Sequence, residues 1–135
     1  MKAETIELVQ HSWKKVAPIA PQAAAIFYDN LFAADSSAKV LFKGDMTQQG
    51  EKLMQMIATA VGKLHNLDVL VPVLQSLAKR HAGYGVVDAQ YASVGAALLK
   101  TLDTGLGADF TPEVRAAWTE VYGFMARVMI EAPKG

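Results

Sequence analysis

Hydrophobic side chains recur at intervals of three, four and seven residues through most of the chain, which is the spacing of one face of an α-helix. No segment alternates with the period of two that a half-buried strand requires. A short helical segment is expected over residues 35–42. Longer helices are expected over residues 6–16, 21–32, 45–64, 72–81, 89–102 and 112–132. The pattern therefore predicts an all-α protein of six to eight helices.

Capping and helix-breaking residues indicate where several of these helices begin. Thr5 is a plausible cap for the first helix, and Asp88 is expected to cap the fifth long one. Residues 65–68 are expected to form a connector, with Pro72 in the first turn of the helix that follows. The strongest start signal is Thr111-Pro112-Glu113, where a capping hydroxyl precedes a proline and an acidic residue.

One apolar stripe ends in a histidine. Leu70, Leu74, Leu77 and His81 fall at i, i+4, i+7 and i+11, so the imidazole is expected to point inward. Glycines follow two and four residues later, so the helix should end close to His81. A neutral imidazole in this position can bind a metal through one nitrogen while a hydrogen bond orients the other. From these residues alone, a partly buried histidine that bonds a backbone carbonyl is the more ordinary alternative.

Two other polar side chains fall on faces that are otherwise apolar. Tyr28 is the one residue with a polar group in the predicted buried face of the second helix. Gln49 lies on the same predicted face as Leu53 in the third long helix, although an amide near a helix start is often merely exposed. His11, by contrast, lies off the stripe of the first helix and is expected at the surface.

Length and composition predict a single globular domain over residues 1–135. Hydrophobic residues make up 52% of the chain, which excludes the composition of a disordered protein. The apolar runs are too short to span a membrane, and the first residues lack the apolar core of a signal peptide. We therefore expect a cytoplasmic protein that does not enter a membrane.

Charge and cysteine content narrow the possible ligands. Lys and Arg number 13 and Asp and Glu number 13, so no basic surface for nucleic acid or anionic lipid is expected. The absence of cysteine excludes disulfides, thiolate metal sites and iron–sulfur clusters, which leaves histidine and carboxylates as metal ligands. The common hydrolase, metalloprotease, phosphate-loop and dinucleotide-binding motifs are also missing.

The remaining chemically interesting residues lie within a series of short motifs. In chain order these are Phe27-Tyr28-x-Asn30-Leu31-Phe32, Leu41-Phe42, Gln49 followed by Lys52-Leu53, Lys79-Arg80-His81, Gly85-Val86, Tyr91-x-x-Val94-Gly95 and Ala117-Trp118-x-x-x-Tyr122-Gly123. In this order and spacing, the chain resembles the bacterial single-domain haemoglobins and the haem domain of flavohaemoglobins over essentially its full length. The resemblance implies a globin fold around a haem pocket.

The resemblance also implies a set of site residues for haem b. His81 would be the proximal iron ligand, with Phe42 packed on the porphyrin. Tyr28, Gln49 and Leu53 would lie on the distal side. The other implied cofactor contacts are Leu77, Val86, Tyr91 and Val94, with Arg80 or Lys52 near a propionate.

Open coordination is expected on the distal side. A neutral histidine leaves the iron one free position for dioxygen, carbon monoxide or nitric oxide. Bound dioxygen carries negative charge, which a phenol and an amide can stabilise by hydrogen bonds. His65 cannot replace Gln49, because 16 helical positions separate them, roughly 24 Å.

Support for the proximal histidine is less complete in this sequence. Tyr91 matches the tyrosine that, in flavohaemoglobins, supports the proximal histidine together with a glutamate of the last helix. Glu131 is the nearest candidate here, but it lies two residues before the family position, which Pro133 occupies. A tyrosine that simply packs in the core is the alternative for Tyr91.

The function that these expectations favour is reversible binding of dioxygen, for oxygen binding or transport. The alternative is a nitric oxide dioxygenase, which would depend on a separate reductase because the chain carries no flavin or nicotinamide domain. A haem sensor would need an output domain. Outside the resemblance, a helical bundle that binds an apolar ligand remains possible.

Overall fold

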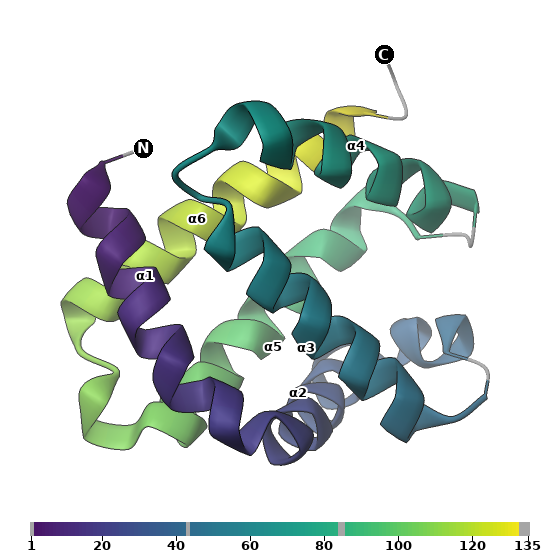
Figure 1. The fold of residues 1–135 in the computed structure, drawn as a ribbon. Helices are drawn as coiled ribbons and strands as arrows, with labels where there is room; N and C mark the ends of the chain where they lie inside the picture. Colours follow the sequence, from purple (N-terminus) through teal and green to yellow (C-terminus); the bar gives the residue numbers. More distant parts are fainter. Residues whose placement is uncertain (1, 43, 84–85, 133–135) are drawn as a thin grey trace.

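A computed structural model describes residues 2–42, 44–83 and 86–132 of the chain. Over these residues the protein consists of helices and connecting segments, without strands (Figure 1). The α-helices (α) and 3₁₀-helices (η) are, in order, α1 (Ala3–Val16), η1 (Ala17–Ile19), α2 (Ala20–Ala34), η2 (Ser36–Leu41), α3 (Met46–Gly62), α4 (Leu67–Gly83), α5 (Asp88–Leu106), η3 (Gly107–Asp109) and α6 (Pro112–Glu131). The predicted all-α fold class is confirmed.

Helices that are far apart in the sequence pack against each other to form the core. The most extensive helix contacts are those of α2 with α5 and of α1 with α6. Helix α6 also packs against α4 and α5. Figure 1 shows α6 crossing behind α1, with α4 above its C-terminal half. The next helix, α3, packs mainly on α2 and α1. The consecutive helices α3 and α4 therefore pack chiefly on different helices and not on each other.

Trp118 is the largest of the fully buried side chains and links α6 to α1. Its indole N–H donates a hydrogen bond of 2.8 Å to the hydroxyl of Ser12. That hydroxyl in turn donates to the main-chain oxygen of Leu8 at 2.8 Å. The ring of Trp13 lies 6.1 Å from that of Trp118, centroid to centroid. Because its one polar atom has a partner, Trp118 can be buried without an unsatisfied donor.

We expect the substitution Ser12→Ala to destabilise the protein. It leaves the buried indole N–H of Trp118 without its acceptor, which costs about 1–3 kcal/mol. Urea denaturation of the variant and of the control Ser76→Ala, at an exposed position on α4, measures the difference. Equal stability of the two variants would show that the Trp118 bond contributes nothing.

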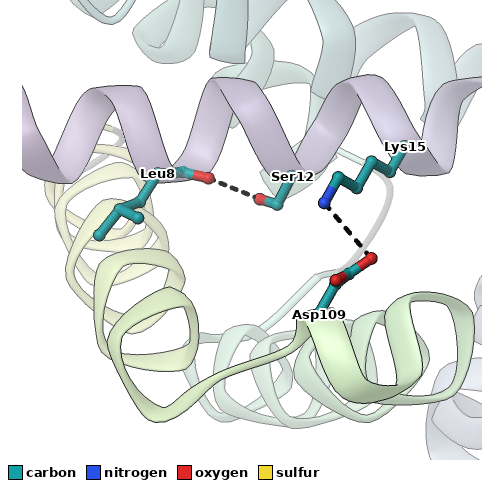
Figure 2. A network of polar contacts seen from close by, with 4 residues as sticks. All are labelled: Leu8, Ser12, Lys15 and Asp109. Carbon is teal, nitrogen blue, oxygen red and sulfur yellow. Dashed lines mark hydrogen bonds and ion pairs between the residues drawn. The ribbon is translucent and has the colours of Figure 1, made fainter.

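Figure 2 shows the same stretch of α1 together with an ion pair at the surface. The ammonium of Lys15 lies 3.3 Å from a carboxylate oxygen of Asp109, in η3. Both side chains are exposed, so the pair contributes little to stability. The buried hydrogen bond between Trp118 and Ser12 is the stronger connection between the first and the last thirds of the chain.

Only some of the predicted helix starts agree with the structure. The hydroxyl of Thr111 accepts a hydrogen bond from the amide of Val114, so the predicted start of α6 is confirmed. Thr5 does not cap α1: the helix begins at Ala3, and Thr5 is buried inside it. Asp88 is the first residue of α5 rather than its cap.

Pro72 is also placed differently from the prediction. The helix begins at Leu67, so Pro72 lies inside α4 rather than in its first turn, and residues 67–68 belong to the helix instead of the connector. An internal proline costs a helix about 3 kcal/mol. Burial of Leu70 and Leu74 on either side of it opposes this cost, so packing decides where α4 begins.

No helix in the described parts of the chain is both long enough and apolar enough to cross a membrane.

Candidate functional site

His81 lies in the last turn of α4, with its side chain half-buried. Its Nδ1 is 2.9 Å from the main-chain oxygen of Leu77. Since a carbonyl oxygen can only accept, Nδ1 carries the proton and Nε2 carries the lone pair. Burial lowers the pKa of His81. The hydrogen bond to Leu77 opposes this with a smaller upward effect, and the charge of Arg80 lowers the pKa slightly further. The result is a neutral, oriented imidazole whose Nε2 is available to bind a metal.

The chain turns back close to this histidine after α4 ends. Gly83 is the last helical residue, and the amide of Val86 donates a hydrogen bond of 3.1 Å to the main-chain oxygen of His81. Gly85, the second glycine of the predicted turn, lies outside the described residues. The start of α5 is thereby fixed near the end of α4.

A group of aromatic rings lies where α2 meets the segment after η2. The ring of Phe42 is 5.2 Å from that of Tyr28 and 5.6 Å from that of Phe32, both edge-to-face. Phe42 follows η2 directly, and the chain then turns at Gly44, whose positive φ of 113° suits glycine. The structure thus places the ring of Phe42 against that of Tyr28.

Tyr28 also meets the residue expected beside it on the distal side, but through the main chain. Its hydroxyl donates a hydrogen bond of 3.3 Å to the main-chain oxygen of Gln49, whose own side chain is half-buried. Burial raises the pKa of Tyr28 to about 12, so the hydroxyl stays protonated at neutral pH. A long bond of this kind is weak, which leaves the hydroxyl able to turn to another acceptor.

The apolar residues implied as cofactor contacts share one property, which is partial burial at the edge of the core. They belong to α3, α4 and α5 and to the segments beside them, and include Leu53, Leu77, Phe42, Val86, Tyr91 and Val94. The helices that carry Leu53 and Leu77 pack chiefly on other partners, α3 on α2 and α1, and α4 on α6. A flat apolar group between α3 and α4 would cover side chains that are otherwise only half-buried.

The two cationic candidates, Lys52 and Arg80, lie at the surface. Lys52 and Arg80 are exposed, as an interaction with a solvent-facing carboxylate requires. His11 and His65 are exposed too, which leaves His81 as the one buried or half-buried histidine. Among the described side chains, no cluster of three or more histidine and acidic residues could hold a metal by itself.

The main chain of Tyr91 is held by Tyr122. Its main-chain oxygen accepts a short hydrogen bond of 2.6 Å from the hydroxyl of Tyr122. The ring of Tyr122 lies so close to Gly95 that a Cβ there would be only 2.7 Å away. Glu131 is exposed at the end of α6, and Pro133 lies outside the described residues. His81 takes its support from Leu77.

A family model matches most of the chain. The family model described as Globin matches residues 10–129. The chain belongs to the globin family. Globins bind diatomic gases through haem, and the match extends from α1 to the last turn of α6. The residues of this globin also fit the group, because a neutral imidazole, an aromatic ring and half-buried apolar side chains are what a haem pocket needs.

Proposed function

We propose that this globin binds haem b through His81 and binds dioxygen reversibly, as a protein of the bacterial single-domain type. The observation that carries the proposal is the state of His81. Its Nδ1 is held by the carbonyl of Leu77 and its pKa is lowered by burial, so Nε2 offers a lone pair at neutral pH. Leu77 lies one helical turn before His81, and Phe42 packs against Tyr28 and Phe32 at the edge of the core.

When bound, haem would supply an iron that can take a diatomic gas. The chain's own contribution is to hold the group and to exclude water from it. The residues proposed to hold it are His81, Phe42, Leu53, Leu77, Val86, Tyr91 and Val94, with Lys52 or Arg80 at a propionate. Most of this surface is apolar, which favours a neutral, water-poor pocket.

Tyr28 and Gln49 are proposed to act on the gas as hydrogen-bond donors. The hydroxyl of Tyr28 is protonated, and its present acceptor at 3.3 Å holds it weakly. Rotation about its C–O bond redirects the hydrogen without moving the ring. The Gln49 amide, near the start of α3, can donate through its NH₂ group. Two donors that favour a polar ligand over an apolar one would slow the release of dioxygen.

The same pair of donors favours a second candidate, a nitric oxide dioxygenase. In that reaction one nitric oxide, one dioxygen and one electron give one nitrate ion. A separate reductase would have to supply the electron. Nitrate formation in step with nitric oxide consumption, under continuous reduction, would support this activity, and its absence would leave oxygen binding as the function.

Repeated oxygenation tests the primary proposal. The reduced, haem-loaded protein is exposed to oxygen and then to inert gas, while its visible spectrum is followed. We expect the spectrum to change on exposure and to return on removal over several cycles. Immediate and irreversible oxidation to the ferric form, with no spectrum of an oxygen complex, would contradict reversible binding.

A further inference from the structure

A group of polar side chains connects the end of α2 and η2 to the beginning of α5. The carboxylate of Asp35 accepts hydrogen bonds from the amide of Ser37, at 3.1 Å, and from the hydroxyl of Ser37. Its other oxygen accepts from the hydroxyl of Ser93 in α5, at 3.1 Å. The bond from the Ser37 side chain is the main reason that the pKa of Asp35 is lowered. Asp35 therefore caps η2 and binds α5 with a single charged group.

Gln90 extends this connection toward the histidine. Its side chain is buried, its Oε1 accepts from the amide of Val87 at 2.9 Å, and its Nε2 lies 3.5 Å from the Ser37 hydroxyl. The residue before Val87, Val86, donates its amide to the main-chain oxygen of His81. Hydrogen bonds thus lead from the end of the His81 helix, through the start of α5, to the segment that precedes Phe42.

Apolar packing holds η2 only loosely. Ala38 is its one buried residue, while Val40 is 71% exposed. Polar bonds are therefore the main connection between this segment and α5, and one of them ends on a charged acceptor, which makes it stronger than a neutral one.

We propose that Asp35, Ser37, Gln90 and Ser93 form a polar clamp that holds the Phe42 segment and the His81 turn in register, and so retains haem in its pocket. The inference rests on the proposed function. The four residues act as positioning residues: they reach the haem through Phe42 and His81 rather than by touching it. Loss of the clamp lets the two sides of the pocket separate, which opens the path by which haem leaves.

The test measures haem loss from the loaded, full-length protein to an excess of a haem-scavenging apoprotein. The variant Ser93→Ala removes one hydrogen bond of the clamp and Gln90→Leu removes two, and each is expected to lose haem at least about tenfold faster. The variant Ser93→Thr keeps the hydroxyl and should restore the rate to within about twofold of the wild type.

Two controls separate the clamp from a general loss of stability. Ser36→Ala changes an exposed serine of the same segment, and Thr101→Val removes a buried hydroxyl of α5 that bonds Asn30 and Ala97. Both should lose haem at the wild-type rate, even though Thr101→Val is expected to lower the melting temperature. The iron–histidine stretching band of the ferrous protein should broaden or shift in Gln90→Leu and stay unchanged in Thr101→Val.

The outcomes distinguish the clamp from the function on which it depends. Faster haem loss in Ser93→Ala and Gln90→Leu, with recovery in Ser93→Thr, supports the clamp. Wild-type rates in the first two variants, or equal acceleration in Thr101→Val, overturn it while leaving the proposed function intact. A wild-type protein that takes up no haem overturns the proposed function, and the clamp with it.

Discussion

The substitution His81→Ala is expected to abolish stable haem binding. It removes the one buried or half-buried histidine whose Nε2 carries a lone pair, and no other described histidine can take its place. Removal of a residue that merely orients a ligand weakens metal sites by about 10- to 100-fold, so removal of the ligand itself should accelerate haem loss by more than about a hundredfold. The Soret band after haem reconstitution and gel filtration measures this loss.

Matched variants make the test specific. His11→Ala and His65→Ala change exposed histidines and should keep the wild-type Soret spectrum. The variant His81→Gly, supplied with free imidazole, should regain part of the wild-type spectrum, because the added base occupies the vacated space. If all three alanine variants bind haem equally well, His81 is not the ligand.

The substitution Tyr28→Phe is expected to accelerate the release of dioxygen by about five to thirty times, since one hydrogen bond in a water-poor pocket contributes about 1–2 kcal/mol. The phenyl ring keeps its contacts with Phe32 and Phe42, so the pocket should retain its shape. Stopped-flow measurement of oxygen release from the ferrous protein gives the rate.

Carbon monoxide provides the control for this experiment. It is much less polar than dioxygen when bound, so its release should change little in Tyr28→Phe. Gln49→Leu should accelerate oxygen release to a similar or smaller extent. The double variant need not show the sum of the two effects, because Tyr28 already contacts the main chain of Gln49. Unchanged oxygen release in Tyr28→Phe would mean that the phenol does not reach the gas.

Periodicity predicted the helices and the inward position of His81, because both depend on which face of a helix is apolar. Leu70 and Leu74 are buried as the stripe requires, and His81 follows them half-buried at the edge of the core. The burial of Tyr28 was predicted in the same way. A polar residue inside an apolar stripe is a signal that one sequence can carry by itself.

The starts of some helices could not be predicted, since packing rather than capping determines them. Thr5 is buried inside α1, where its burial outweighs its preference for a cap. Pro72 lies within α4 although proline disfavours that position. In each case the contacts between helices, which local sequence does not contain, decide the outcome.

The polar clamp was not predicted from the sequence, although the pattern of α5 contains a signal for one of its residues, Gln90. Gln90, Ala97 and Thr101 are all buried and fall at i, i+7 and i+11 on α5, so two polar residues lie on one buried stripe. Attention to that stripe would have identified Gln90. Asp35 and Ser93 give no such signal, because their contact joins residues 58 positions apart.

The most direct test of the central claim is the visible spectrum of the ferrous, haem-loaded protein under inert gas. We expect the broad, single-banded spectrum of five-coordinate iron, because the proposed site offers one imidazole, that of His81, and the amide of Gln49 would be a poor second ligand. A narrow, split spectrum of six-coordinate low-spin iron would contradict the account, as it would require a second strong ligand from the chain at the position proposed for the gas.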